Sequence, residues 1–140
     1  MSSSAETVRF ASGCQVVASG ALEADNAEDA GGGSGALARG TAVSAGGMWL
    51  GTSVLPPGHS SVSHHHNDQT TIVCIIAGQM TFFIEGPEGE EEFTVSPGQI
   101  AVVPGGLTHR ETNPGSVECV CVVTRNAEKP VVVNAVRSRP

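Results

Sequence analysis

Histidine is the residue of this sequence best suited to chemistry, and four of its five copies lie close together. His64, His65 and His66 are consecutive, His59 lies shortly before them, and His109 stands alone further along the chain. Imidazole side chains bind divalent metal ions and transfer protons near neutral pH. The cluster therefore predicts a metal site, with an exposed polar loop as the alternative.

Strand geometry would divide this cluster, because side chains alternate between the two faces of a β-strand. If residues 61–66 form a strand, His64 and His66 point the same way, about 7 Å apart along the backbone. His65 then points to the opposite face. The cluster reduces to one chelating pair and one bystander, and the pair needs a third ligand from elsewhere.

Two groups of residues share a regular spacing of glycine, proline and histidine. The first group is Gly58, His64, His66 and Gly78, and the second is Gly98, Pro104, Gly106, His109 and Asn113. In this order they resemble the two sequence motifs of the cupin superfamily, over roughly residues 45–125. The resemblance implies an all-β fold, an antiparallel β-sandwich closed as a jelly-roll barrel.

The resemblance also assigns one divalent metal ion per chain and its ligands. His64 and His66 would bind it from one strand, and His109 from another. Zinc is favoured, because three histidines and a water molecule form a known type of catalytic zinc site. Fe(II), Mn, Ni and Co are the alternatives that such ligands also accept.

The first motif departs from the family at one position. In cupins, three or four residues usually separate the second histidine from a glutamate, and this chain has Thr70 and Thr71 at those positions. The site is therefore expected to be all-imidazole, a strong Lewis acid that favours anionic ligands. Water or substrate, His59, or the amide oxygen of Gln69 could fill the empty position. A cupin that has lost its metal is the remaining alternative.

Short β-like runs separated by Gly and Pro turns dominate the chain from residue 40 onward, as in sandwiches and barrels. We expect one domain over 1–140 with four parts. Residues 1–19 carry an N-terminal strand, 20–40 a flexible acidic and Gly-rich loop, 41–125 the cupin core, and 126–140 a C-terminal strand and tail.

Composition excludes several classes of partner. A formal net charge of −7 argues against nucleic acid and anionic membranes, and no apolar run is long enough to span a bilayer. The opening residues lack a secretory signal, so we expect a cytoplasmic protein whose four cysteines are reduced, buried thiols. A homodimer is expected, because small cupins often pair.

The apolar runs predict a hydrophobic cup without an Arg or Lys inside, which suits a small hydrophobic substrate. The favoured function is a metal-dependent cyclase, isomerase or lyase that stabilises an enolate of a β-dicarbonyl or polyketide-like compound. His59 would be its proton-transfer residue. In general character this resembles the cupin-type polyketide cyclases of antibiotic biosynthesis. A three-histidine Fe(II) dioxygenase and a non-catalytic ligand-binding cupin are the alternatives.

Overall fold

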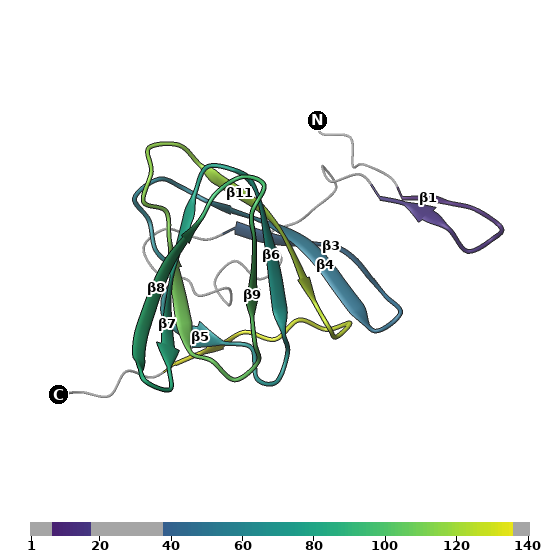
Figure 1. The fold of residues 1–140 in the computed structure, drawn as a ribbon. Coiled ribbons are helices and arrows are strands. Elements are labelled where there is room, and N and C mark those ends of the chain that lie inside the picture. Colours follow the sequence, from purple (N-terminus) through teal and green to yellow (C-terminus); the bar gives the residue numbers. More distant parts are fainter. Residues whose placement is uncertain (1–6, 18–37, 136–140) are drawn as a thin grey trace.

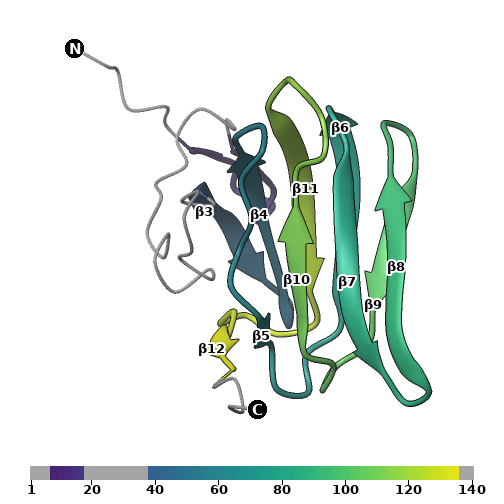
Figure 2. The ribbon, with the colours of Figure 1, turned by 90° about the vertical axis from the view of Figure 1, so that its left-hand side faces the viewer.

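Two five-stranded antiparallel sheets pack face to face, as the sequence predicted for a cupin barrel. The computed structural model describes residues 7–17 and 38–135. The first sheet has the order β3-β4-β11-β6-β9, and the second β12-β5-β10-β7-β8 (Figures 1 and 2). The first contains β3 Ala38–Ala45, β4 Met48–Leu55, β6 Thr71–Ala77, β9 Ile100–Val103 and β11 Cys119–Arg125. The second contains β5 His64–His65, β7 Met80–Gly86, β8 Gly89–Val95, β10 His109–Thr112 and β12 Val133–Asn134.

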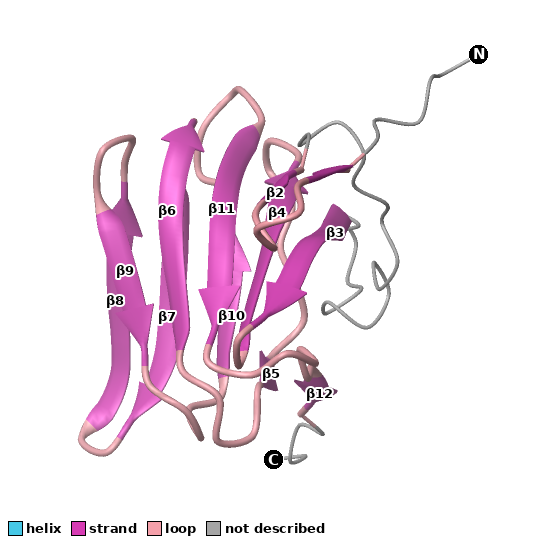
Figure 3. Ribbon diagram, turned by 90° about the vertical axis from the view of Figure 1, so that its right-hand side faces the viewer, coloured by secondary structure: helices cyan, strands magenta, loops and turns pink. Residues whose placement is uncertain are grey.

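The described residues contain no helix, and so none that could cross a membrane (Figure 3). A separate hairpin, β1 Val8–Arg9 and β2 Gln15–Val16, stands away from the barrel on the side of β3 and β4 (Figure 1). The acidic loop predicted for 20–40 lies outside the described residues up to 37, and residues 38–40 already belong to β3.

Strict alternation of burial along the central strands builds the core between the sheets. On β11, Cys119, Cys121, Val123 and Arg125 are buried, and the residues between them are partly exposed. The inward residues of both sheets form one cluster around Trp49 and Phe82. Branched residues with this period of two fit a pleated, half-buried surface. Cys14 is exposed and Cys74 is only partly buried, so the prediction of four buried thiols is right for Cys119 and Cys121 alone.

Glycines place the turns that end these strands. The four motif glycines Gly58, Gly78, Gly98 and Gly106 all have positive φ angles, between 76° and 88°. Gly78 is also required sterically, because a Cβ there would collide with the backbone of Glu118 and Cys119. It therefore allows β6 to turn into β7 directly beneath the start of β11.

The strand predicted over 61–66 is shorter than expected, since only His64–His65 pairs with neighbours. β10 lies beside β5 in antiparallel register, with His109 opposite His64. β12 covers the other edge of β5 through the pairs Val133–His65 and Asn134–His64. Residues that are far apart in the sequence thus meet at one end of the barrel.

Candidate metal centre

Three histidines converge inside the barrel, as their spacing predicted. His64, His66 and His109 are all buried, and their ring centroids lie 4.6–5.1 Å apart. One ligand atom from each residue lies within 4.8 Å of the other two. His65 is only half-buried and pairs with β12, so it is the bystander that strand alternation indicated. The register of β5 against β10 brings two of these ligands together.

Backbone carbonyls orient all three rings in the same way. Nδ1 of His64 donates to Val62 O at 2.8 Å, and Nδ1 of His66 donates to Val131 O at 2.7 Å. Nδ1 of His109 donates to Leu107 O at 2.9 Å. A carbonyl only accepts, so the proton is fixed on Nδ1 and Nε2 is left for the centre. This is the arrangement that orients histidine ligands in metal sites, and the three residues fit a divalent ion.

A carboxylate completes the group, although the usual motif position lacks one. Oε2 of Glu111 lies 3.0 Å from Nε2 of His109 and 3.4 Å from Nε2 of His64. Glu111 is 5% exposed, and its Oε1 has no hydrogen-bond partner within the described residues. The converging ligand atoms are the three imidazoles, and Glu111 lies beside them as a carboxylate that the sequence analysis did not anticipate. The carboxylate comes from β10, two residues after His109, instead of from the start of β6.

Burial and charge set the protonation of these groups. Burial first, and then the charge of Arg125, lower the pKa of His66 to about 2, so His66 is neutral. Burial alone would raise the pKa of Glu111, but His64 and His109 outweigh it and hold that pKa well below its usual value. Burial alone would lower the pKa of His109, but Glu111 outweighs it and raises that pKa. In the metal-free centre, His109 and Glu111 thus each favour the charged form of the other.

Of the two residues considered as a fourth ligand, Gln69 is hydrogen-bonded elsewhere and His59 lies outside the group of converging ligand atoms. Nε2 of Gln69 donates to Lys129 O at 2.8 Å, and its Oε1 accepts from Val131 N at 3.2 Å. Gln69 therefore anchors the segment whose Val131 carbonyl orients His66. His59 does not belong to the group of converging ligand atoms. Its backbone amide donates to Pro56 O, and its carbonyl accepts from Asn113 N, which places it in a turn.

Arg125 is the functional candidate that sequence reasoning missed. It ends β11, is 2% exposed, and its Nε donates to Thr71 Oγ1 at 3.0 Å. Its Nη2 lies 3.4 Å from Nε2 of His66, and its guanidinium stands over the Trp49 ring at 5.1 Å. The prediction of a cup without a cation is therefore wrong. By contrast Arg110 points outward and stacks on Phe83 at 3.9 Å, as alternation indicated.

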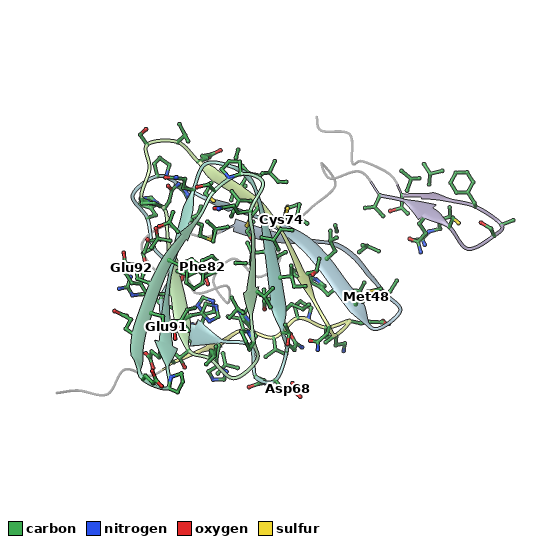
Figure 4. All side chains as sticks on the ribbon, in the orientation of Figure 1. Met48, Asp68, Cys74, Phe82, Glu91 and Glu92 are labelled. Atoms are coloured by element: carbon green, nitrogen blue, oxygen red, sulfur yellow. The ribbon has the colours of Figure 1, made fainter. Side chains whose placement is uncertain are left out.

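These groups surround a small cavity. Its volume is about 20 Å³, and its polar lining includes Ser53, His66, Thr71, His109, Glu111 and Arg125. A cavity of this size admits one ion or one water molecule. Phe82 closes it from the side of β7 and points into the barrel (Figure 4). The arrangement can hold a cation between imidazole and carboxylate donors, with a guanidinium beside it.

Comparison with known proteins agrees with this description. The family description "Cupin domain" matches residues 51–125, more than half of the chain. An oxalate oxidase structure is 27% identical over 64% of this chain, with a TM-score of 0.59. The chain spans 46% of that protein.

Two further structures share the fold alone. A double-stranded β-helix protein from Klebsiella pneumoniae, described as uncharacterised, is 18% identical with a TM-score of 0.59, and the match covers 71% of this chain and 84% of that one. An oxalate decarboxylase is 14% identical with a TM-score of 0.63, over 69% of this chain and 27% of that one. No curated protein sequence matches the chain.

Proposed function

The chain belongs to the cupin superfamily, and we propose that it is a metal-dependent enzyme acting on a small acid that carries a carbonyl group. The observation that supports this is the placement of Arg125 and Glu111 beside three converging histidines at one small cavity. A divalent ion there would supply Lewis-acid stabilisation of an enolate oxygen. Side chains of the protein would bind the part of the substrate that the ion does not contact.

Charge inside the cup favours an anionic substrate. With neutral histidines, the ion and Arg125 together exceed the single negative charge of Glu111, so the centre stays positive. Uncompensated charge in a buried site is costly, and an anion that binds there reduces the cost. A guanidinium recognises carboxylates with two parallel donors. We therefore assign the carboxylate end of the substrate to Arg125 and its carbonyl end to the metal side.

The size of the cavity favours a short substrate over a polyketide. Room for one ion or water is left between the sheets, and Trp49 and Thr71 hold the Arg125 side chain against this space. A keto acid of a few carbon atoms would have to displace Arg125 from its contact with His66 to fit beside an ion. Glu111 Oε1 has no hydrogen-bond partner among the described residues, and it would accept the proton from the carbon next to the ketone carbonyl.

The deciding experiment joins metal analysis to a proton-exchange assay. Untagged protein would be analysed for bound metals, and the loaded enzyme incubated with short α- and β-keto acids in D2O. We expect zinc, and deuterium at the carbon next to the ketone carbonyl, without oxygen uptake. A metal-loaded protein that exchanges no α proton in any of these acids would overturn the proposal. Tight binding of the acids without exchange would instead support the non-catalytic alternative.

Oxidation of a small dicarboxylate is a second candidate, favoured by the 27% identity with oxalate oxidase. It also suits a positively charged cup, because oxalate is a dianion, but it needs a redox-active metal. Oxalate has no α proton, so the two candidates separate cleanly. Manganese or iron in the protein, with oxygen uptake on addition of oxalate, would support oxidation. Zinc without oxygen uptake would exclude it.

A further inference from the structure

The Nε2 atom of each converging histidine lies beside a charged side chain. Nε2 of His64 and Nε2 of His109 lie 3.4 and 3.0 Å from Oε2 of Glu111. Nε2 of His66 lies 3.4 Å from Nη2 of Arg125. Because Nδ1 of His66 donates its proton to a backbone carbonyl, its Nε2 is an acceptor, and the guanidinium donates to it. A cation therefore already uses the lone pair that a metal ion would need at His66.

Cross-strand neighbours hold the Arg125 side chain in this position. In the strand register Arg125 stands opposite Trp49 on β4 and opposite Thr71 on β6. Its Nε donates to Thr71 Oγ1 at 3.0 Å, and its guanidinium stands over the Trp49 ring at 5.1 Å. All three residues are buried, with exposed fractions of 1–4%. The guanidinium is therefore kept beside His66.

The charge of Arg125 opposes a divalent ion at the same histidines. A guanidinium keeps its proton at every pH at which a protein stays folded. An ion that takes the lone pair of His66 would break the hydrogen bond from Arg125 and would stand next to its positive charge. Like charges repel each other more strongly in a buried site than in water. Arg125 should therefore weaken the binding of the metal ion when nothing else enters the site.

A small carboxylate would remove this opposition. Its two oxygens accept parallel hydrogen bonds from a guanidinium, and carboxylate oxygens are also ligands of divalent ions. It could therefore accept from Arg125 in place of His66 and put negative charge between two positive charges. The cavity of about 20 Å³ admits one ion or one water molecule while Arg125 is in its present position, so only a small anion fits.

We propose that Arg125 couples the two ligands of this site, so that a divalent metal ion binds tightly only together with a small carboxylate. The inference rests on the proposed function in one respect, namely that the three histidines take a divalent ion. It goes further because it assigns to Arg125 a weakening effect on metal binding when the anion is absent. Such coupling is reciprocal: the carboxylate raises the affinity for the metal by the same factor as the metal raises the affinity for the carboxylate.

Isothermal titration of metal-free wild type with Zn²⁺, with and without about 50 mM sodium formate, measures this coupling. We expect formate to raise the affinity for zinc at least about 10-fold, within the usual range of coupling between two sites. Without formate, Arg125→Met should bind zinc at least about 3-fold more tightly than wild type, because the competing cation is gone. It should gain less than about 3-fold from formate.

Arg110→Met is the matched control, because Arg110 stacks on Phe83 outside the cup. It should bind zinc as wild type does under both conditions. It also corrects for formate that binds zinc in free solution, since that effect is the same for every variant. If Arg125 had only a structural role, its loss would weaken zinc binding, which is the opposite sign.

Circular dichroism would verify that the variants fold. Should Arg125→Met fail to fold, Arg125→Gln takes its place, since an uncharged amide can still donate to Thr71. Zinc affinity of wild type that formate leaves unchanged overturns the inference, and so does weaker zinc binding by a folded Arg125→Met.

None of these measurements depends on turnover, so the two proposals can fail separately. Coupling without deuterium exchange in any keto acid would sink the proposed enzyme and leave the role of Arg125 standing. Exchange without coupling would sink the role of Arg125 alone. Zinc binding by no variant under either condition would overturn both.

Discussion

His109 and Glu111 stand two residues apart on β10, and their side chains meet inside the barrel with 3.0 Å between Nε2 and Oε2. This pair gives the centre a carboxylate that the usual position at the start of β6 does not provide. Ser61 fixes Glu111 from outside the pair, because its Oγ accepts from Glu111 N and its own amide donates to Glu111 O. The backbone that carries the carboxylate is therefore held on both sides.

Glu111→Gln should lower metal affinity about 10- to 100-fold, the usual effect of losing a group that supports the ligands. The amide keeps the shape of the side chain and removes its negative charge. Isothermal titration with Zn²⁺ measures the change. Glu92→Gln, on the exposed face of β8, is the control and should bind as wild type does. Equal affinities for Glu111→Gln and wild type would show that the carboxylate does not serve the metal.

His66→Ala should abolish stoichiometric metal binding, whereas His65→Ala should keep it. The neighbouring residues differ in direction: His66 is 3% exposed and joins the converging group, and His65 faces β12. Elemental analysis of both variants, purified without a tag, makes the comparison. Equal loss of metal in both variants would mean that folding, and not ligation, had been disturbed.

Removing the metal should lower the melting temperature of wild type and leave that of His66→Ala unchanged. A ligand that binds only the folded state stabilises it by about 2.7 kcal/mol at a free concentration of 100 times its Kd. For a domain of this size that corresponds to roughly 5–15 °C. Thermal unfolding before and after chelator treatment measures the shift. The same shift in His66→Ala would indicate a metal bound elsewhere.

Arg125→Met should retain the metal and lose about 10- to 100-fold in affinity for a keto acid, since hydrogen bonds to charged groups contribute about 1.5–3 kcal/mol. Methionine fills similar apolar space beside Trp49 without the charge. Titration of the acid into metal-loaded protein separates this loss from any effect on metal binding. Arg110→Met, which removes an outward guanidinium, should leave acid binding intact. If it weakens binding equally, the acid does not bind in the cup.

The metal-free protein should lose stability as the pH falls from 6.5 toward 4.5. The pKa of His66 is about 2 in the folded protein, against an ordinary value of 6.5, so the unfolded chain takes up a proton that the folded chain refuses. The contribution of His66 to the free energy of unfolding is therefore fully present above pH 6.5, and it is lost as the pH falls. The lowered pKa of Glu111 likewise makes the folded protein less stable as the pH falls below 4.5. The raised pKa of His109 has the opposite effect: it stabilises the folded protein at low pH, and this stabilisation is lost as the pH rises above 6.5.

Urea unfolding of chelator-treated protein at several pH values tests whether the free energy of unfolding falls as the pH falls. His66→Gln should flatten the decline between pH 6.5 and 4.5, because glutamine takes up no proton. His65→Gln should follow wild type. An identical decline in all three proteins would assign the acid sensitivity to other groups.

The barrel, its turns and the three converging histidines were predictable because they depend on local rules. Positive φ angles required glycine at the motif positions, and the period of two separated His65 from its neighbours. Glu111 was not predicted, because the carboxylate was expected at Thr70 or Thr71. Side chains two positions apart on a strand share a face, so Glu111 would have been found by counting from His109. Arg125 lacked such a signal. It occupies the last inward position of an apolar strand, and only the packing of Thr71 and Trp49 from other strands keeps it inside.

Val131 is separated from His66 by 65 positions in sequence, yet its carbonyl holds the Nδ1 proton of that ligand. Lys129 and Val131 are in turn fixed by the Gln69 amide, within the first motif. During translation, a nascent chain that has reached only β11 already contains all three histidines but leaves one of them unoriented. The ion would therefore bind only after the segment that follows β11 has been synthesised and has packed against His66.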